Sequence, residues 1–267
     1  MSNEDKHLPL FQHALDAPSA FTPESLLEAV RAERNLPQDP VPEVCVLEFD
    51  GDLTDWLVAT GHANRWRPWA CFHTSMETVE VDGECFGLIA RTIGGPYAVL
   101  VAEQLAASGA RVILGLTSAG QVSPGLTIPS LVVPVRAIRD EGTSYHYLPA
   151  AESVDGDAGL AAALQEELGG LGLPVVTGPV WTTDAPYRET LEQLERHTTN
   201  GILAVEMQAA SLLAFGAARG VRCGVVAHVT NGVDHSSEGQ FDKGTHQLGF
   251  GILKAMSRAG RRCLHDR

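Results

Sequence analysis

Short, continuously apolar runs alternate along this chain with longer segments in which apolar residues recur at helical spacing. The short runs are typical of strands that are covered on both faces, and the longer segments have the 3.6-residue period of helices. The predicted strands are residues 44–49, 86–92, 111–116, 131–136, 174–181 and 221–230. The predicted helices are residues 97–109, 157–170, 187–197, 201–220 and 246–262. This alternation predicts an α/β sandwich around a mixed or mostly parallel sheet.

The first 42 residues have a different pattern. They contain one predicted helix at residues 24–33, which begins at Thr22 or Pro23, and then a turn-rich stretch that reads NLPQDPVP. At 267 residues, the chain is long enough for one large domain with a substantial core. We therefore interpret residues 1–42 as an N-terminal extension and residues 43–267 as a single domain.

Charge and hydropathy narrow the classes of partner. The formal net charge is −14, and the sequence has no basic stretch long enough to follow a phosphate backbone, so we expect no nucleic-acid binding. Its apolar runs are shorter than the roughly 20 residues that cross a bilayer, and its first residues are too polar for a signal peptide. We expect a cytoplasmic protein without a membrane partner.

The cysteines and histidines show no metal-binding spacing. The five cysteines include no Cys-x-x-Cys pair, and three of them lie in apolar segments that we interpret as strands: Cys45, Cys85 and Cys223. This placement indicates buried, reduced thiols. Three histidines towards the end of the chain match no zinc pattern: His228, His235 and His246. We expect no metal.

Ligands of α/β proteins gather in the loops beyond the carboxyl ends of the strands. Three such segments are of interest here: 115–121, 180–190 and 228–235. Residues 115–121, GLTSAGQ, could present backbone N–H groups to a ligand or could be only a turn. In residues 180–190, Trp181 and Tyr187 could sandwich a planar ring that Asp184 or Arg188 hydrogen-bonds. The alternative is a helix start, with Asp184 as its cap and Arg188 paired with Glu192.

A carboxylate and an amide interrupt the apolar stretch ILAVEMQAAS at residues 202–211. A buried carboxylate without partners costs several kcal/mol, so Glu206 must either have partners or contact a ligand. Glu206 and Gln208 cannot share one face of a helix, because they are two residues apart. Both could reach a ligand only if a helix begins here with an irregular first turn.

Taken in order, several segments resemble the nucleoside phosphorylase superfamily of the purine and uridine phosphorylase type, which includes hydrolytic nucleosidases. The segments are VLEFDGD, DGE, TIGGPYAVLVAEQL, LTSAG, WTTDAPYRET, AVEMQAA and VTN, and they cover about residues 43–260. The resemblance implies that residues 43–267 form a nucleoside phosphorylase-like domain. Its fold would be a three-layer α/β sandwich whose central mixed sheet is partly closed into a barrel.

The resemblance also implies an activity, cleavage of the N-glycosidic bond between ribose and a base. It implies no metal or organic cofactor, with phosphate as a possible co-substrate, and self-association into dimers or hexamers in which a neighbour supplies some active-site residues. By position, Met207 would pack against the ribose of a nucleoside, beside Glu206, and Gln208 would bind its 2′ and 3′ hydroxyls. The residues expected to face the base are Trp181, Asp184, Tyr187, Arg188 and Asn231. Those expected around the anion or nucleophile are His73, Thr117 and Ser118.

The chain departs from this family's pattern at the phosphate site. Where the first turn usually contains a Gly-Asp-Pro sequence followed by an arginine, residues 49–53 read FDGDL; Phe72 and Gly115 occupy the other two arginine positions. Phosphate binding beside extra carboxylates and without arginines is unfavourable. Alternative arginines that could rebuild an anion site are Arg67, Arg91 and Arg136.

Two further departures concern catalysis. Gln208 replaces the second glutamate of the family's Glu-Met-Glu triplet, and Asn231 replaces an aspartate that purine-specific members use as a general acid; an amide cannot deliver a proton. The missing phosphate arginines favour hydrolysis over phosphorolysis. The candidate catalytic residues are Glu48, Asp50, Asp52 and Gln208, of which the three acidic residues could orient water. The alternative is a non-catalytic protein that binds or senses a nucleoside or base.

Overall fold

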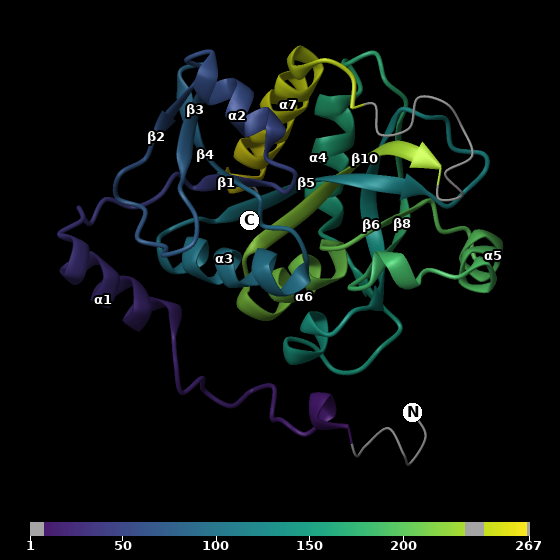
Figure 1. Cartoon of the computed structure of the whole chain (residues 1–267), viewed down its shortest axis with the longest axis horizontal. Coiled ribbons are helices and arrows are strands. Elements are labelled where there is room, and N and C mark those ends of the chain that lie inside the picture. The colour runs from purple at the N-terminus through teal and green to yellow at the C-terminus, as the bar shows by residue number, and fades with distance from the viewer. Residues whose placement is uncertain (1–7, 233–242, 266–267) are drawn as a thin grey trace.

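A mixed β-sheet organises the chain in this computed structural model, which describes residues 8–232 and 243–265 (Figure 1). Within the described residues the strands are β1 (Val44–Glu48), β2 (Ala63–Arg65), β3 (Glu77–Val81), β4 (Glu84–Ala90), β5 (Val112–Gln121), β6 (Ser130–Asp140), β7 (Ser153–Asp155), β8 (Val175–Thr183), β9 (Ala204–Glu206) and β10 (Arg222–Gly232). The α-helices are α1 (Pro23–Arg34), α2 (Asp52–Ala59), α3 (Gly95–Ala107), α4 (Ala158–Leu168), α5 (Leu191–Thr199), α6 (Ala209–Arg219) and α7 (His246–His265). In the described ranges, the 3₁₀ turns are η2 (Pro9–Phe11), η3 (Thr143–His146) and η4 (Pro186–Arg188).

Part of the sheet closes on itself. The strand order is β10-β6-β8-β9-β5-β1-β4-β3-β2, and β10 also pairs with β5 in parallel. Strands β5, β10, β6, β8 and β9 therefore form a closed ring, while β1 to β4 extend from it as an open sheet. The single α/β domain with a partly barrel-like mixed sheet, expected from the sequence, is confirmed.

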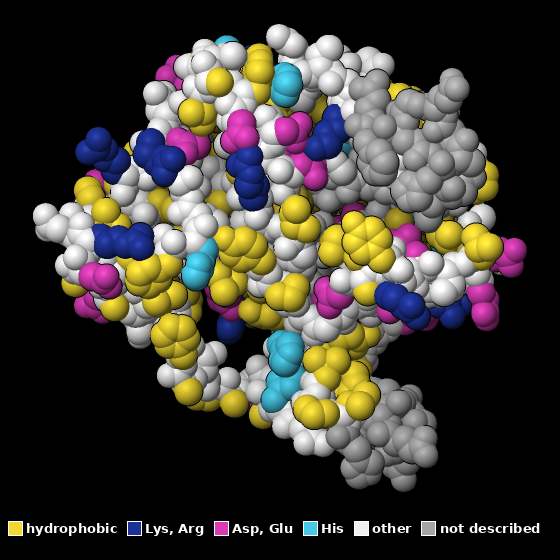
Figure 2. Space-filling model, in the orientation of Figure 1, with side chains coloured by type: hydrophobic (Ala, Val, Ile, Leu, Met, Phe, Trp, Pro, Cys, Tyr) yellow, Lys and Arg dark blue, Asp and Glu magenta, His cyan; other side chains and the backbone are white. Residues whose placement is uncertain are grey.

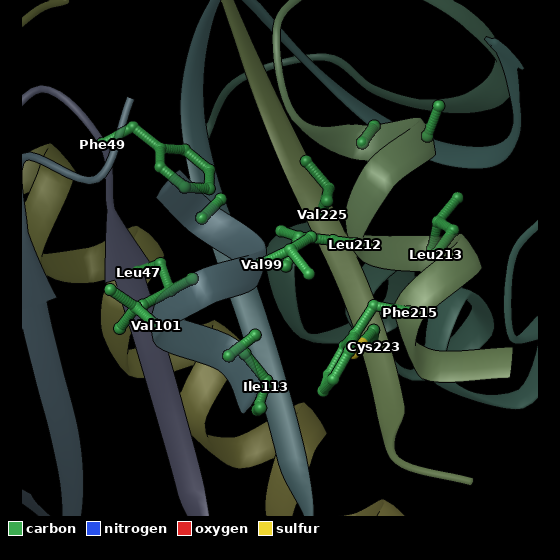
Figure 3. Packing of buried hydrophobic residues seen from close by; sticks show 14 of the residues in the cluster. Leu47, Phe49, Val99, Val101, Ile113, Leu212, Leu213, Phe215, Cys223 and Val225 are labelled. Atoms are coloured by element: carbon green, nitrogen blue, oxygen red, sulfur yellow. The ribbon is translucent and has the colours of Figure 1, made fainter. Parts of the chain in front are cut away.

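Both faces of the sheet are covered, as the continuous apolar runs predict. Along β1, Cys45 and Leu47 pack in the cluster that includes α3 and α6, whereas Val44 and Val46 pack in the cluster that includes α4 and α7. In Figure 1, α3 and α6 lie below the sheet and α4 and α7 above it. Figure 3 shows the first cluster, in which residues from β1, β5 and β10 lie beside Val99 of α3 and Leu212 of α6.

Two predicted helices are corrected by the structure. Residues 201–220 are not one helix, because β9 completes the barrel and α6 begins only at Ala209. The helix predicted at 187–197 begins at Leu191, where Thr190 and Gln193 form a capping box; residues 186–188 form η4 instead. Short elements without a strong apolar period were not predicted, namely α2, β2, β3 and β7.

Residues 8–42 lie along the outside of the α3 layer. Leu27 and Val30 of α1 are buried in a small cluster with Ala70. Further towards the N-terminus, Phe11 makes an edge contact with the ring of Tyr145 in η3. The segment that we interpret as an extension is thus attached at two places.

The structure shows which cysteines are buried and how charged side chains are distributed on the surface. Of the strand cysteines predicted to be buried, Cys45 and Cys223 are buried, but Cys85 is exposed, because it pairs with Glu80 next to the turn of the β3–β4 hairpin. Across the face seen in Figure 2, acidic and basic side chains are interspersed with hydrophobic ones. Within the described chain, no helix combines the length and apolarity needed to span a bilayer.

Candidate active site

A cleft with two compartments lies at the carboxyl ends of β1, β5 and β10. These strands run parallel, so the residues that follow β1 meet those that end β5 and β10. The α7 compartment has a volume of about 340 Å³ and is lined by Glu48, Asp50, Asp52, Leu53, Leu116, Thr117, Ser118, His228, Lys243, Gly244, Thr245, His246, Gly249 and Ile252. The β9 compartment has a volume of about 630 Å³ and is lined by Asp50, Ser118, Ala119, Gly120, Pro186, Tyr187, Glu189, Val205, Glu206, Met207, Thr230, Asn231 and Lys243.

Three residues line both compartments: Asp50, Ser118 and Lys243. Oδ2 of Asp50 accepts a hydrogen bond from Oγ of Ser118 at 2.6 Å and lies 3.0 Å from Nζ of Lys243. Among the described residues, Oδ1 of Asp50 has no hydrogen-bond partner. We call this junction the seam. At the seam, Oδ1 of Asp50 has no partner in the part of the chain that the structure describes, and Oδ2 accepts from both Ser118 and Lys243.

Lys243 also pairs with Asp52, at 2.8 Å. Partial burial on its own would raise the pKa of Asp52, but the hydrogen bond and charge of Lys243 outweigh it, so that the pKa is lowered. Burial would likewise lower the pKa of Lys243, yet the two aspartates raise it. Lys243 is therefore a firmly charged ammonium between two carboxylates.

Sequence reasoning missed Lys243. It is one of only three lysines in the chain, and it stands just before a predicted helix in a segment with no recognisable motif. That scarcity is the one feature of the sequence that could have drawn attention to it. Its proximity to residues 50–52 depends on α7 packing against β1 and α2, which the local pattern does not reveal.

Glu48 has a different role from the two aspartates. It is buried, and its oxygens accept hydrogen bonds from the backbone N–H of Gly51 at 2.8 Å and from both the N–H and the hydroxyl of Thr54, at 3.2 and 2.9 Å. Burial raises the pKa of Glu48, against these hydrogen bonds. Glu48 therefore anchors the first turn of α2, and its oxygens are already engaged.

The acidic residues could be considered as ligands for a cation. One carboxylate oxygen from each of Glu48, Asp50 and Asp52 lies within 4.8 Å of the others. Glu48 already accepts hydrogen bonds from Gly51 and Thr54, and Lys243 pairs with one oxygen of Asp50 and one of Asp52. Of the histidines considered from the sequence, His228 and His246 line the α7 compartment, and His235 lies outside the described residues.

Glu206 and Gln208 occupy the junction between β9 and α6. Oε1 of Glu206 accepts from the hydroxyl of Thr182 at 2.5 Å, and Oε2 accepts from the N–H groups of Gln208 and Ala209 at 2.6 and 2.8 Å. Burial raises the pKa of Glu206 to about 7. Glu206 lines the β9 compartment, but its main contacts hold the start of α6.

Gln208 is the residue that precedes α6, as the irregular first turn considered from the sequence requires. Its Oε1 accepts from the hydroxyl of Thr117 at 3.1 Å and from the N–H of Met207 at 3.3 Å. Because a backbone N–H can only donate, the acceptor must be the amide oxygen. Within the described chain, the amide N–H groups of Gln208 are left without a protein partner.

The residues predicted to face a base are only partly brought together. Tyr187 and Asn231 line the β9 compartment. Trp181 is buried, and its Nε1 donates to Asp140 at 2.9 Å. Asp184 accepts from the N–H of Gly142 at 2.9 Å, and Arg188 ends η4 outside the residues that line the compartment. The expectation that Trp181 and Asp184 contact a base therefore has no support in this geometry.

The residues expected around the anion lie at two separate places in the structure. Thr117 and Ser118 lie at the cleft, whereas His73 lines a separate surface hollow together with Arg91 and Tyr97. His73 follows Phe72, which is partly exposed beneath the guanidinium of Arg34. The structure does not bring His73 to Ser118.

Arginine is missing from both compartments among the described residues. A Cβ at Gly115 would lie 2.9 Å from the ring of Phe49, so the buried Phe49 fills the space that a larger side chain would need. Two of the alternative arginines are engaged elsewhere, since Arg91 pairs with Asp55 and Arg136 pairs with Asp155, and Arg67 is exposed and lines neither compartment. The cleft therefore has acidic groups and one lysine where an anion site would need guanidinium groups.

His197 is a buried imidazole behind this cleft. It lies in the last turn of α5 and stacks on Trp181, with ring centroids 4.4 Å apart. Its Nε2 is buried and has no hydrogen-bond partner within the described residues. Trp181 packs in turn against Val205, which lines the β9 compartment. Burial lowers the pKa of His197 below its ordinary value of 6.5.

Replacing His197 with Phe is expected to weaken the pH dependence of stability. Because the folded state favours the neutral imidazole, the stability that His197 contributes is complete above its ordinary pKa of 6.5 and is lost as the pH falls through the lowered pKa. The free energy of unfolding in urea should therefore fall less steeply with acidification for His197→Phe than for the wild type. Parallel pH curves for the two proteins would contradict this expectation.

Comparisons with known proteins found a family model and several relatives that match this chain. A family model described as the phosphorylase superfamily matches residues 48–256. Uridine phosphorylase of Salmonella typhimurium is 27% identical over 164 residues, which is 56% of this chain and 65% of that protein. Guanosine phosphorylase of Halorubrum lacusprofundi is 28% identical over 152 residues, or 55% of this chain and 61% of the relative. The chain thus spans somewhat less than two thirds of the length of these relatives.

Proposed function

Because the chain belongs to the phosphorylase superfamily, we propose that it cleaves the N-glycosidic bond of a nucleoside with water as the nucleophile. The observation that carries the choice of water is the seam. There, Lys243 pairs with Asp50, and it also pairs with Asp52 in the adjoining α7 compartment, so that the three residues form an ion-pair network. The family match supports the type of bond, and the charges of the cleft support the nucleophile.

The nucleoside would occupy the β9 compartment. Met207 and the seam lie on its walls, together with Tyr187 and Asn231. In this arrangement Met207 packs against the sugar. Gln208 is buried and is not among the residues that line this compartment, and we propose that its amide N–H groups, which have no partner within the described chain, donate to a sugar hydroxyl. Tyr187 and Asn231 face the base, and the Asn231 amide can hydrogen-bond the leaving base as negative charge develops on it.

Phosphate is a poor candidate for the nucleophile in this cleft. A phosphate dianion near Ser118 would lie close to the carboxylates of Asp50 and Asp52, and the single ammonium of Lys243 is already paired with both. Coulomb repulsion at such short range is not offset without further cations. Water carries no charge and is compatible with a carboxylate that has one free oxygen. The same carboxylate also favours the positive charge that develops on the sugar during glycosidic cleavage.

The test is a panel of purine and pyrimidine nucleosides incubated with the protein in phosphate-free buffer and in buffer with phosphate. We expect release of free base at the same rate in both buffers, with the free sugar as the second product. A strict requirement for phosphate, with ribose 1-phosphate as the product, would overturn the choice of water. Heat-treated protein in the same buffers is the matched control for contaminating enzymes.

A second candidate function is a protein that binds a nucleoside or base without cleaving it. The observation that favours it is the pair of amides, Gln208 and Asn231, at positions where neither can transfer a proton. On this alternative, nucleosides or bases would raise the melting temperature while prolonged incubation releases no base. Turnover at an ordinary enzymatic rate would remove this candidate.

A further inference from the structure

Lys243 is the only described lysine in the cleft, and the proposed reaction leaves its role open. Its Nζ lies 3.0 Å from Oδ2 of Asp50 and 2.8 Å from Oδ1 of Asp52, and its side chain is about one-third exposed. Asp52 thus fixes the ammonium from one side, and the ammonium fixes Asp50 from the other. Lys243 is not among the candidate residues that the sequence analysis identified.

The hydrogen bonds of Asp50 define its orientation. Oδ2 accepts from the hydroxyl of Ser118 at 2.6 Å as well as from Lys243, while Oδ1 has no partner among the described residues. A carboxylate held at one oxygen by two donors from different elements has little freedom to rotate. Its second oxygen therefore points in a defined direction, which is the requirement for a group that must meet a water molecule in one geometry.

We propose that Lys243 is a positioning residue, which holds Asp50 so that its free oxygen takes the proton of the attacking water; this role rests on the function proposed above. In that step the water oxygen bonds to the anomeric carbon, and one water proton passes to Oδ1 of Asp50. The C–N bond breaks, and its electron pair leaves with the base. The base takes a proton from solvent, and Asp50 returns its proton to solvent, so that atoms and charge balance.

The same arrangement explains how a cationic residue can lie in the cleft without creating an anion site. The ammonium is bonded to two carboxylates, so Asp50, Asp52 and Lys243 together keep an excess of negative charge. In this proposal Lys243 therefore orients Asp50, and its charge is not available to bind phosphate. A lysine that served as an anion ligand would instead need to be free of one of these partners.

The experiment compares Lys243→Met with the wild type and with Lys254→Met. Lys254 lies on α7 over the ring of Phe250, away from the seam, and is the matched control. We expect Lys243→Met to lower kcat about 10- to 100-fold with KM changed less than about threefold, because a misplaced catalytic group costs rate without changing nucleoside contacts. Lys243→Arg should keep more activity than Lys243→Met, and Lys254→Met should match the wild type.

A rescue experiment separates positioning from a general effect on the fold. Lys243→Ala leaves room for an external amine, so propylammonium chloride should restore part of the lost kcat, whereas tetramethylammonium chloride, which cannot donate a hydrogen bond, should not. This comparison is made within one variant and does not depend on its stability.

The outcomes distinguish this role from the proposed function. A wild-type protein that cleaves nucleosides, together with unchanged kcat in Lys243→Met, would overturn the role of Lys243 alone. Lost activity in Lys243→Ala that propylammonium does not restore would also overturn it. A wild-type protein that cleaves none of the nucleosides would overturn the proposed function and, with it, this role.

Discussion

Asp50→Asn is expected to lower kcat for nucleoside cleavage by about 10²- to 10⁴-fold, the usual contribution of a positioned general base. The amide can still accept the hydrogen bonds from Ser118 and Lys243 through its oxygen, so the geometry of the seam should be largely retained. Its NH₂ group would then replace the free oxygen, and an NH₂ group cannot take a proton from water. The measurement is steady-state release of free base, with the melting temperature of each protein as a check on folding.

The control for this substitution is Asp155→Asn. Asp155 is exposed and pairs with Arg136 at 2.7 Å, outside both compartments of the cleft. We expect it to retain wild-type kcat. If Asp50→Asn kept more than about a tenth of wild-type kcat, a loss smaller than a general base normally gives, another group would have to activate the water.

Glu206→Ala is expected to lower the free energy of unfolding by about 3–5 kcal/mol, because removing a buried acceptor leaves several donors unsatisfied. Those donors are the hydroxyl of Thr182 and the N–H groups of Gln208 and Ala209, and the methyl group also leaves a cavity at the start of α6. Urea unfolding gives the measurement. Glu195→Ala, on the exposed side of α5, is the control and should change stability by less than about 0.5 kcal/mol.

The charge of Glu206 adds a pH dependence to this prediction. Since burial raises its pKa to about 7 from an ordinary value of 4.5, the stability that Glu206 contributes is complete below about pH 4.5 and is lost as the pH rises through about 7. Glu206→Gln keeps one acceptor oxygen and removes the titration. The difference in unfolding free energy between the wild type and Glu206→Gln should therefore shift towards the variant as the pH rises. A difference that does not vary with pH would contradict the raised pKa.

Glu206 and His197, two of the buried titrating groups, act in opposite directions. His197 destabilises the fold on acidification, whereas Glu206 destabilises it as the pH rises. In the wild type these contributions partly cancel, so a flat pH profile would not show that either group is unperturbed. The single variants are needed to separate them.

The sequence predicted the main framework because local patterns determine it. The strands β1, β4, β5, β6, β8 and β10 are continuous apolar runs, and such runs must be covered on both faces wherever they lie in the sheet. The same local reasoning identified Glu206 and Gln208, since polar side chains inside an apolar run need partners whatever the fold. It failed at β9, a three-residue strand whose pairing with β5 and β8 closes the barrel.

By itself, the sequence determined the α/β class, the cleft-forming segments around Ser118, Met207 and Asn231, and the lack of the family's phosphate arginines. Only the tertiary structure decided which polar residues meet at the seam. Lys243 pairs with Asp50 and Asp52, which lie nearly two hundred residues earlier in the chain. Trp181 is buried, where its ring nitrogen donates to Asp140 and its ring stacks on His197. Contacts of this kind depend on how distant elements pack, and neither apolar periodicity nor residue spacing carries that information.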